Sequence, residues 1–212
     1  MAKIIWGEAG SRYFEAGLDR GVFFLDANPG LPWNGLISVD ERSSGGEARP
    51  IYLDGFKILN LAGAEEFEAT IGSYYPPVGF EVCDGTVSIS NGLFATQQPR
   101  KPFSFSYRTR IGNDLEGVDL GYKIHIVYNA LALAAERNRS TISDQAEPQQ
   151  FSWEVTTLPP IVAGLKPTSH FVIDSRFTDP EDLSDFEDIL YGSEVAPSRL
   201  PDAEELLSIF GA

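Results

Sequence analysis

The residues best suited to chemistry in this chain are two histidines, His125 and His170, and one cysteine, Cys83. Group transfer by side chains needs a nucleophile, a base and a group that orients the base. The chain has no G-x-S-x-G motif, no phosphate-binding glycine loop with lysine and no histidine pair at helical spacing. Both histidines fall inside strand-like segments, so we interpret them as hydrogen-bonded sheet residues, and Cys83 as a buried thiol. We therefore expect neither an enzyme nor a bound cofactor or metal.

One oxygen-rich run is a candidate Ca²⁺ site and comprises Asn113, Asp114, Glu116 and Asp119. Its spacing does not match the EF-hand calcium loop, and no bidentate glutamate follows at its end. The run also lies between two strand-like segments. We therefore expect an ordinary polar hairpin loop.

The chain is strongly acidic, with 16 basic and 31 acidic residues and a formal charge of -15. This charge argues against a protein that grips nucleic acid through its phosphates, whereas a conduit past which DNA slides is served by repulsion. Four basic residues nevertheless cluster in the sequence: Arg100, Lys101, Arg108 and Arg110. We expect them to pair with acids of the same or a neighbouring subunit.

Neither a membrane span nor a secretion leader is expected. No apolar run approaches the roughly 18 to 20 residues that a transmembrane helix needs. The first residues, MAKIIWGEAGSR, lack the apolar region of a cleaved leader.

Two alternating segments, residues 103–111 (FSFSYRTRI) and 122–128 (YKIHIVY), are expected to form the centre of the fold. A period of two gives each strand two different faces. The apolar faces are Phe103, Phe105, Tyr107, Thr109 and Ile111 on the first strand, and Tyr122, Ile124, Ile126 and Tyr128 on the second. The opposite faces are Ser104, Ser106, Arg108 and Arg110, and Lys123, His125 and Val127. We expect this pair to bury its aromatic face in a core and to turn its polar face to water or to a neighbouring subunit.

The elements around this pair indicate a mainly β fold. Turn signals interrupt the first 100 residues at short intervals, which is typical of a β-sandwich or barrel. Residues 67–71 alternate at strand spacing, which favours a strand over a helix. Residues 130–150 are polar and are expected to form a loop or a helical turn. The further strands are expected at residues 21–26, 36–42, 51–53, 56–59, 67–71, 86–90, 151–157 and 170–174.

A β-hairpin is predicted at residues 51–59 (IYLDGFKIL), because Asp54 and Gly55 can occupy both left-handed positions of a type I′ turn. The glycine-rich segment 43–46 precedes it. Its apolar residues, Ile51, Leu53, Phe56 and Ile58, are unusual for a solvated loop. Two interpretations stay open: an ordinary core hairpin, or an arm of about residues 43–59 that docks on another subunit.

The C-terminal region differs in composition. From Asp174 onward, eleven acidic residues and two arginines contribute -9 of the formal charge. Asp179, Pro180 and Gly192 are the cap, first turn and stop of one expected helix, and Pro201 begins a second. We therefore divide the chain into a β-sandwich domain, residues 1–174, and an acidic helical extension, residues 175–212.

Several segments together resemble the major tail protein, or tail tube protein, of long-tailed, non-contractile actinobacteriophages. They are WGEAGSR, YRTRIGND, GVDLGYKIHIVYNA, FSWEVTTLPP, KPTSHFVIDSR and FEDILYG, which occur in the same order over nearly the whole chain. The resemblance implies a β-sandwich of the tail-tube type whose sheets join across subunits. Copies would form hexameric rings that stack into a tube and conduct DNA into the host.

This resemblance also implies the partners and the location of the protein. Partners would be further copies of the chain, the tail terminator, the distal tail protein and the tape measure protein, with DNA passing without specific binding. The protein would be assembled in the host cytoplasm and reside in the virion tail. The subunit interface is expected to use Ile51, Leu53, Phe56, Ile58, Arg108 and Arg110. The helical extension would decorate the outside.

Two alternatives remain open at this point. The first is a tail terminator or head-tail connector, which forms a single ring and does not polymerise. The second is a monomeric β-sandwich binding module that uses Trp33, Trp153 or surface tyrosines.

Overall fold

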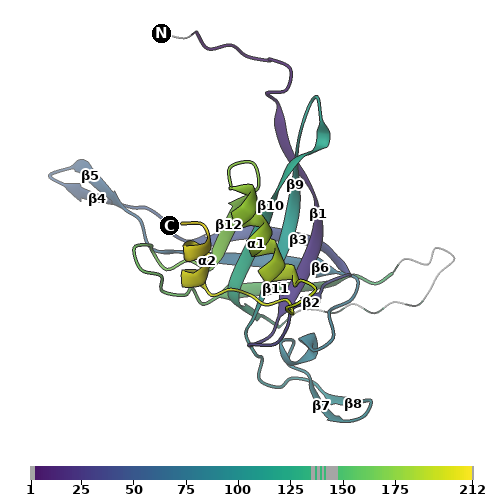
Figure 1. Cartoon of the computed structure of the whole chain (residues 1–212). Helices are drawn as coiled ribbons and strands as arrows, with labels where there is room; N and C mark the ends of the chain where they lie inside the picture. Colours follow the sequence, from purple (N-terminus) through teal and green to yellow (C-terminus); the bar gives the residue numbers. More distant parts are fainter. Residues whose placement is uncertain (1–2, 135–136, 138, 140, 142–147, 212) are drawn as a thin grey trace.

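The computed structural model describes residues 3–134, 137, 139, 141 and 148–211 of the chain (Figure 1). Its strands are β1 Tyr13–Phe24, β2 Leu31–Pro32, β3 Leu36–Gly45, β4 Arg49–Leu53, β5 Phe56–Leu61, β6 Glu65–Ser73, β7 Val87–Ser90, β8 Leu93–Ala95, β9 Phe103–Asn113, β10 Gly117–Ala132, β11 Phe151–Thr157 and β12 His170–Asp174. A 3-10 turn covers Phe80–Val82, and the helices are α1 Pro180–Tyr191 and α2 Ala203–Ile209. The expected mainly β fold with C-terminal helices is confirmed.

One antiparallel sheet forms the body, in the order β2-β1-β9-β10-β11-β6-β3, with β12 also paired to β10. The long strand β10 pairs with β12 through Lys123–Val127 and with β11 through Ala130–Ala132. Between these stretches Asn129 has a φ of 50°, and the register against β9 shifts. Such irregularities bend a strand. The sheet therefore folds over, and β1, β9 and β10 run steeply across β3, β6 and β11 (Figure 1).

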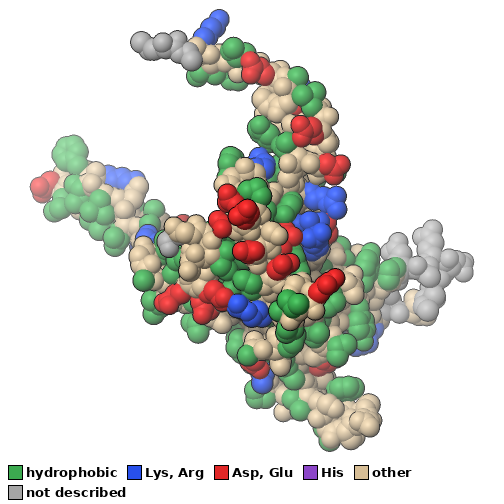
Figure 2. Space-filling model, viewed as in Figure 1, with side chains coloured by type: hydrophobic (Ala, Val, Ile, Leu, Met, Phe, Trp, Pro, Cys, Tyr) green, Lys and Arg blue, Asp and Glu red, His purple; other side chains and the backbone are tan. Residues whose placement is uncertain are grey.

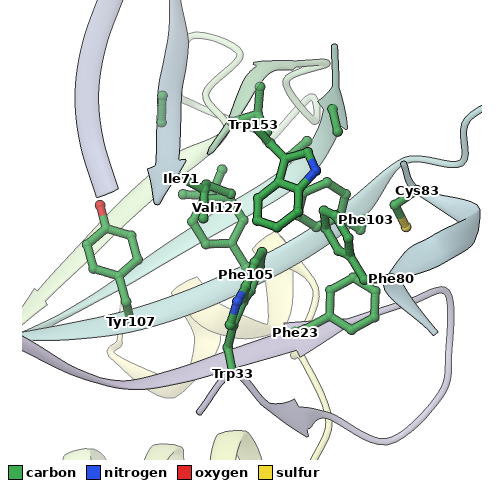
Figure 3. Packing of buried hydrophobic residues seen from close by; sticks show 14 residues of the cluster. Phe23, Trp33, Ile71, Phe80, Cys83, Phe103, Phe105, Tyr107, Val127 and Trp153 are labelled. Carbon is green, nitrogen blue, oxygen red and sulfur yellow. The ribbon is translucent and has the colours of Figure 1, made fainter. Parts of the chain in front are cut away.

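The inner core lies between these two layers and is dominated by aromatic rings (Figure 3). Phe80, in the 3-10 turn, packs edge-on against Phe103 and Trp153, with ring centroids 5.2 and 5.0 Å away. The Trp33 indole donates a hydrogen bond of 2.9 Å to Ser73, which satisfies its buried N–H. Cys83 is buried in the same cluster, as expected, and burial raises its pKa to about 12.

A second core lies on the other face of β1 and β10, beneath the C-terminal helices. Leu183, Phe186 and Leu190 of α1 are buried against Ile124 and Ile126 of β10. Asp179 caps α1 by accepting a hydrogen bond from the Glu181 backbone N–H, and Gly192 ends the helix with a φ of 85°, as predicted. The helices therefore pack on this face of the sheet.

The predicted faces of β9 and β10 require a correction. The register pairs Ile124 with Arg108 and Val127 with Phe105, so the apolar faces of the two strands point to opposite sides of the sheet. Ser106, expected to face water or another subunit, is only 1% exposed because the helices cover its side of the sheet. Each side of the pair is thus buried against a different core.

Other expected elements agree with the structure, some of them with changed limits. The hairpin is confirmed as β4 and β5, and residues 65–71 lie in the strand β6. The first strand begins at Tyr13, well before the predicted start at residue 21. Residues 93–95 form an unpredicted partner strand for β7. The predicted loop or helical turn at 130–150 begins within β10 and for the rest lies largely outside the described residues.

Candidate functional site

The most prominent surface feature is the β4–β5 hairpin, which extends away from the body (Figure 1). All of its strand residues are exposed, and Phe56 near the tip is 75% exposed. The predicted interface residues Ile51, Leu53, Phe56 and Ile58 all lie here. Tyr52, Leu59 and Leu61 add further exposed apolar side chains. Figure 2 shows this apolar surface as the far end of the projecting hairpin.

This hairpin, which we call the arm, is defined by its local turns. Asp54 and Gly55 at the tip have φ values of 50° and 82°, as a type I′ turn requires. At its base, Gly45 and Gly46 have φ values of 78° and 72°. A Cβ on Gly45 would lie 2.6 Å from the backbone oxygen of Ala64, so this position also needs glycine for space. The chain thus leaves the sheet sharply, and an isolated two-stranded hairpin of this kind is marginally stable in water.

The N-terminal segment is a second projecting surface with exposed apolar residues. Ile4, Ile5 and Trp6 are exposed, and Trp6 is 82% exposed. The segment projects beyond the β9–β10 turn (Figure 1). Asp114 accepts hydrogen bonds from the backbone N–H groups of Gly10 and Arg12.

A third projection is the β7–β8 hairpin at the opposite end of the body (Figure 1). Its exposed apolar residues are Val87, Ile89, Leu93 and Phe94. The β7–β8 pair forms a separate two-stranded sheet. Three extensions of the chain therefore present apolar side chains away from the two cores.

The polar run between β9 and β10 forms a hairpin loop, as expected. Asn113 accepts hydrogen bonds from the backbone N–H groups of Leu115 and Glu116. The Asp114 carboxylate accepts a hydrogen bond from the N-terminal segment, and the Asp119 carboxylate lies 3.8 Å from the Arg110 guanidinium. These side chains thus serve the loop and its neighbours.

The two arginines expected at an interface pair within the chain. Arg108 donates two hydrogen bonds to Asp19, of 2.7 and 2.8 Å, and its guanidinium lies over the Tyr122 ring. Arg110 donates to the same carboxylate and is about half exposed. The hydrogen bond from Arg108 lowers the pKa of Asp19 despite its partial burial. Intramolecular pairing accounts for both cations, and Arg108 is largely covered.

A polar cluster that the sequence did not reveal lies where β3 approaches β10 and β12. It contains Glu41, His125 and His170, whose potential ligand atoms all lie within 4.8 Å of one another. The closest pair is His125 Nδ1 and His170 Nε2, 3.1 Å apart. The Tyr107 hydroxyl donates a 2.5 Å hydrogen bond to Glu41. Burial is the main cause that lowers the pKa of both histidines, so both imidazoles are neutral near pH 7.

The sequence placed both histidines in strands but could not bring them together. They are 45 positions apart, and their contact depends on the register between β10 and β12, which aligns Val127 with His170 and His125 with Val172. Glu41 approaches from β3, which connects to β10 only through β6 and β11 along the sheet. The alternation of residue types was the signal that placed each side chain on a strand. No signal in the sequence indicated that the sheet folds over.

No protein-family model matches the chain, and no curated protein sequence is similar to it. Among solved structures, it is similar to the anti-feeding prophage cap, a tube-terminating cap, with 9% identity and a TM-score of 0.33. The similarity covers 82% of this chain and 97% of that chain. Such a distant likeness does not assign a function to this chain. Within the described residues, no helix is both long and apolar enough to cross a membrane.

Proposed function

We propose that this chain is a structural virion protein of a phage tail, whose copies assemble into rings that stack into a tube. The observation that carries the proposal is the arm, with exposed apolar residues throughout its two strands. Exposed apolar surface of this kind marks a protein interface or an aggregation hazard. An arm at the end of a glycine-bounded connection can reach a neighbouring copy and bury these residues there.

The sheet edges and the charge support the same proposal. Within the described residues β2 and β3 are the terminal strands of the sheet order, and β2 contains only Leu31–Pro32. When one surface of a copy binds a different surface of the next copy, the copies form a ring if the rotation between them closes. Rings that stack through two different surfaces can continue to add further rings. The formal charge of -15 suits a channel past which DNA moves without being held.

The finer features of the proposal come from the sequence resemblance. They are hexameric rings, a long non-contractile tail, assembly in the host cytoplasm and contacts with the tail terminator, distal tail protein and tape measure protein. The division into residues 1–174 and 175–212 is retained as a description of composition. Because α1 and α2 cover one sheet face, we place the lumen-facing surface elsewhere on the body or on its extensions.

The test compares assembly of the wild type with that of an arm variant. Leu53→Asp combined with Phe56→Asp places two charges on exposed arm positions. The matched control is Leu158→Asp combined with Ile161→Asp, at two exposed apolar residues between β11 and β12. Sedimentation velocity and negative-stain electron microscopy are recorded over a range of concentrations. We expect stacked rings or tubes for the wild type and the control, and smaller species for the arm variant.

The outcomes separate the candidate functions. Isolated wild-type rings at every concentration would favour a terminator or connector, and a wild type that stays monomeric would favour a binding module. If the arm variant assembled as readily as the wild type, the arm would not be the docking element. Circular dichroism of each variant verifies that the body is folded.

A further inference from the structure

The cluster of Glu41, His125 and His170 brings three metal-ligating side chains from three strands to one point. His125 in β10 and His170 in β12 lie on neighbouring strands and share the inward face. Glu41 comes from β3, across the interior of the folded sheet. A ligand held by all three would therefore connect the two layers of the sandwich.

The distances between the donor atoms fit a small ion. A tetrahedral ion with ligand bonds of about 2.0–2.1 Å holds its ligand atoms about 3.3–3.4 Å apart. His125 Nδ1 lies 3.1 Å from His170 Nε2 and 3.5 Å from Glu41 Oε1. These two separations lie on either side of the tetrahedral value. All three donor atoms lie within 4.8 Å of one another, so the side chains must close around the ion to bind it.

The surrounding hydrogen bonds prepare His125 as a ligand. Its Nε2 lies 3.1 Å from the Thr109 hydroxyl, and that hydroxyl lies 2.5 Å from Glu15 Oε1. An ionised carboxylate only accepts, so Thr109 donates its proton to Glu15 and accepts the Nε2–H of His125. The proton of His125 is then on Nε2, and the lone pair of Nδ1 points into the cluster. Metal-bound histidines are oriented by outer hydrogen bonds of this type.

The other two side chains are also positioned. Tyr107 donates to Glu41 Oε1, which fixes the carboxylate beside the imidazoles. In the metal-free state His170 Nε2–H donates to His125 Nδ1. When an ion takes this place, the His170 proton moves to Nδ1, which lies 3.8 Å from Glu41 Oε2. The exchange of tautomers leaves the ring neutral and frees Nε2 to coordinate.

We propose that Glu41, His125 and His170 form a binding site for one divalent transition-metal ion of the zinc class. Two imidazole nitrogens and one carboxylate are a donor set that suits Zn²⁺, whereas Ca²⁺ and Mg²⁺ prefer oxygen ligands. The ion fastens β3 to β10 and β12. Because β3 leads directly into the base of the arm at Gly45, the ion also fixes the strand from which the arm projects. This site is independent of the proposed function, since it requires no second copy of the chain.

The experiment uses chelator-treated protein without an affinity tag, since added histidines would bind metal themselves. Isothermal titration with Zn²⁺ measures stoichiometry and affinity, and Co²⁺ absorption reports nitrogen coordination. We expect one ion per chain and a loss of at least about 100-fold in affinity for His170→Gln or Glu41→Gln. Glu66→Gln changes an exposed carboxylate of β6 outside the cluster and serves as the matched control.

A measurement on the wild type alone avoids any dependence on how the variants fold. Imidazole nitrogen chemical shifts, followed by NMR during Zn²⁺ addition, should move at His125 Nδ1 and His170 Nε2. Unchanged shifts at saturating Zn²⁺ would overturn the proposal. Equal zinc affinity of folded His170→Gln and wild type would overturn it as well. Neither result bears on tube assembly, so the two proposals fail separately.

Discussion

Replacing Phe186 by alanine tests whether the C-terminal helices belong to the folded body. Phe186 is 0% exposed and belongs to the core formed by α1, α2, β1, β10 and β12. Its ring centroid is 5.4 Å from that of Phe210. Removal of a fully buried phenylalanine ring costs about 3–5 kcal/mol when the cavity does not collapse. Because a domain is stable by only about 5–15 kcal/mol, the loss should be a large part of the total.

The assay is urea unfolding followed by far-ultraviolet circular dichroism and tryptophan fluorescence, at a concentration where sedimentation shows one species for all variants. Phe177→Ala is the control, because this ring is 82% exposed and contacts Arg176 at the surface. We expect the control to lose less than about 1 kcal/mol. The unfolding slope should remain the same if the helices unfold with the sheet.

The reasoning would be refuted by a free-energy loss below about 1 kcal/mol for Phe186→Ala, which is the range of surface changes. Two separate unfolding transitions would likewise show that the helices form an independent unit. In that case the helices would not close the face that carries Ile124 and Ile126 in solution.

Two further predictions concern the sheet. The hydrogen bonds from Arg108 and Arg110 lower the pKa of Asp19 in the folded protein. The ionised carboxylate therefore stabilises the fold at pH values above the pKa of about 4 that Asp has in the unfolded chain. This contribution is lost as the pH falls through the folded-state pKa. The stability deficit of Asp19→Asn against the wild type should therefore shrink below about pH 4, and a deficit independent of pH in urea titrations would contradict this account. Gly112→Ala should destabilise the β9–β10 hairpin, because a Cβ there would clash with the Gly117 carbonyl. Gly92→Ala is the control: there is open space around its Cβ position, and only the left-handed φ strains the alanine. Thermal unfolding should show a smaller loss of stability for Gly92→Ala than for Gly112→Ala.

The local sequence was sufficient for many elements. Strict alternation predicted β9 and β10, and the Asp54–Gly55 pair predicted the turn of the arm. Asp179, Pro180 and Gly192 marked the limits of α1. These signals depend on neighbouring residues, because a strand repeats every two positions and a helix cap acts within one turn. The beginning of β1 was missed since Glu15, Asp19 and Arg20 interrupt its apolar pattern.

Which face of each strand is buried, and which side chains meet, was decided by contacts between segments that are distant in the sequence. The sequence showed that β9 and β10 each have an apolar face, but only the register of Ile124 opposite Arg108 placed those faces in two different cores. A shift of one residue exchanges the faces of a strand, and no local pattern records it. In the same way, the sequence contained His125, His170 and Glu41 on three strands. The fold-over of the sheet near Asn129 brought them within reach of one another, because it converts separation along the sheet into contact across its interior.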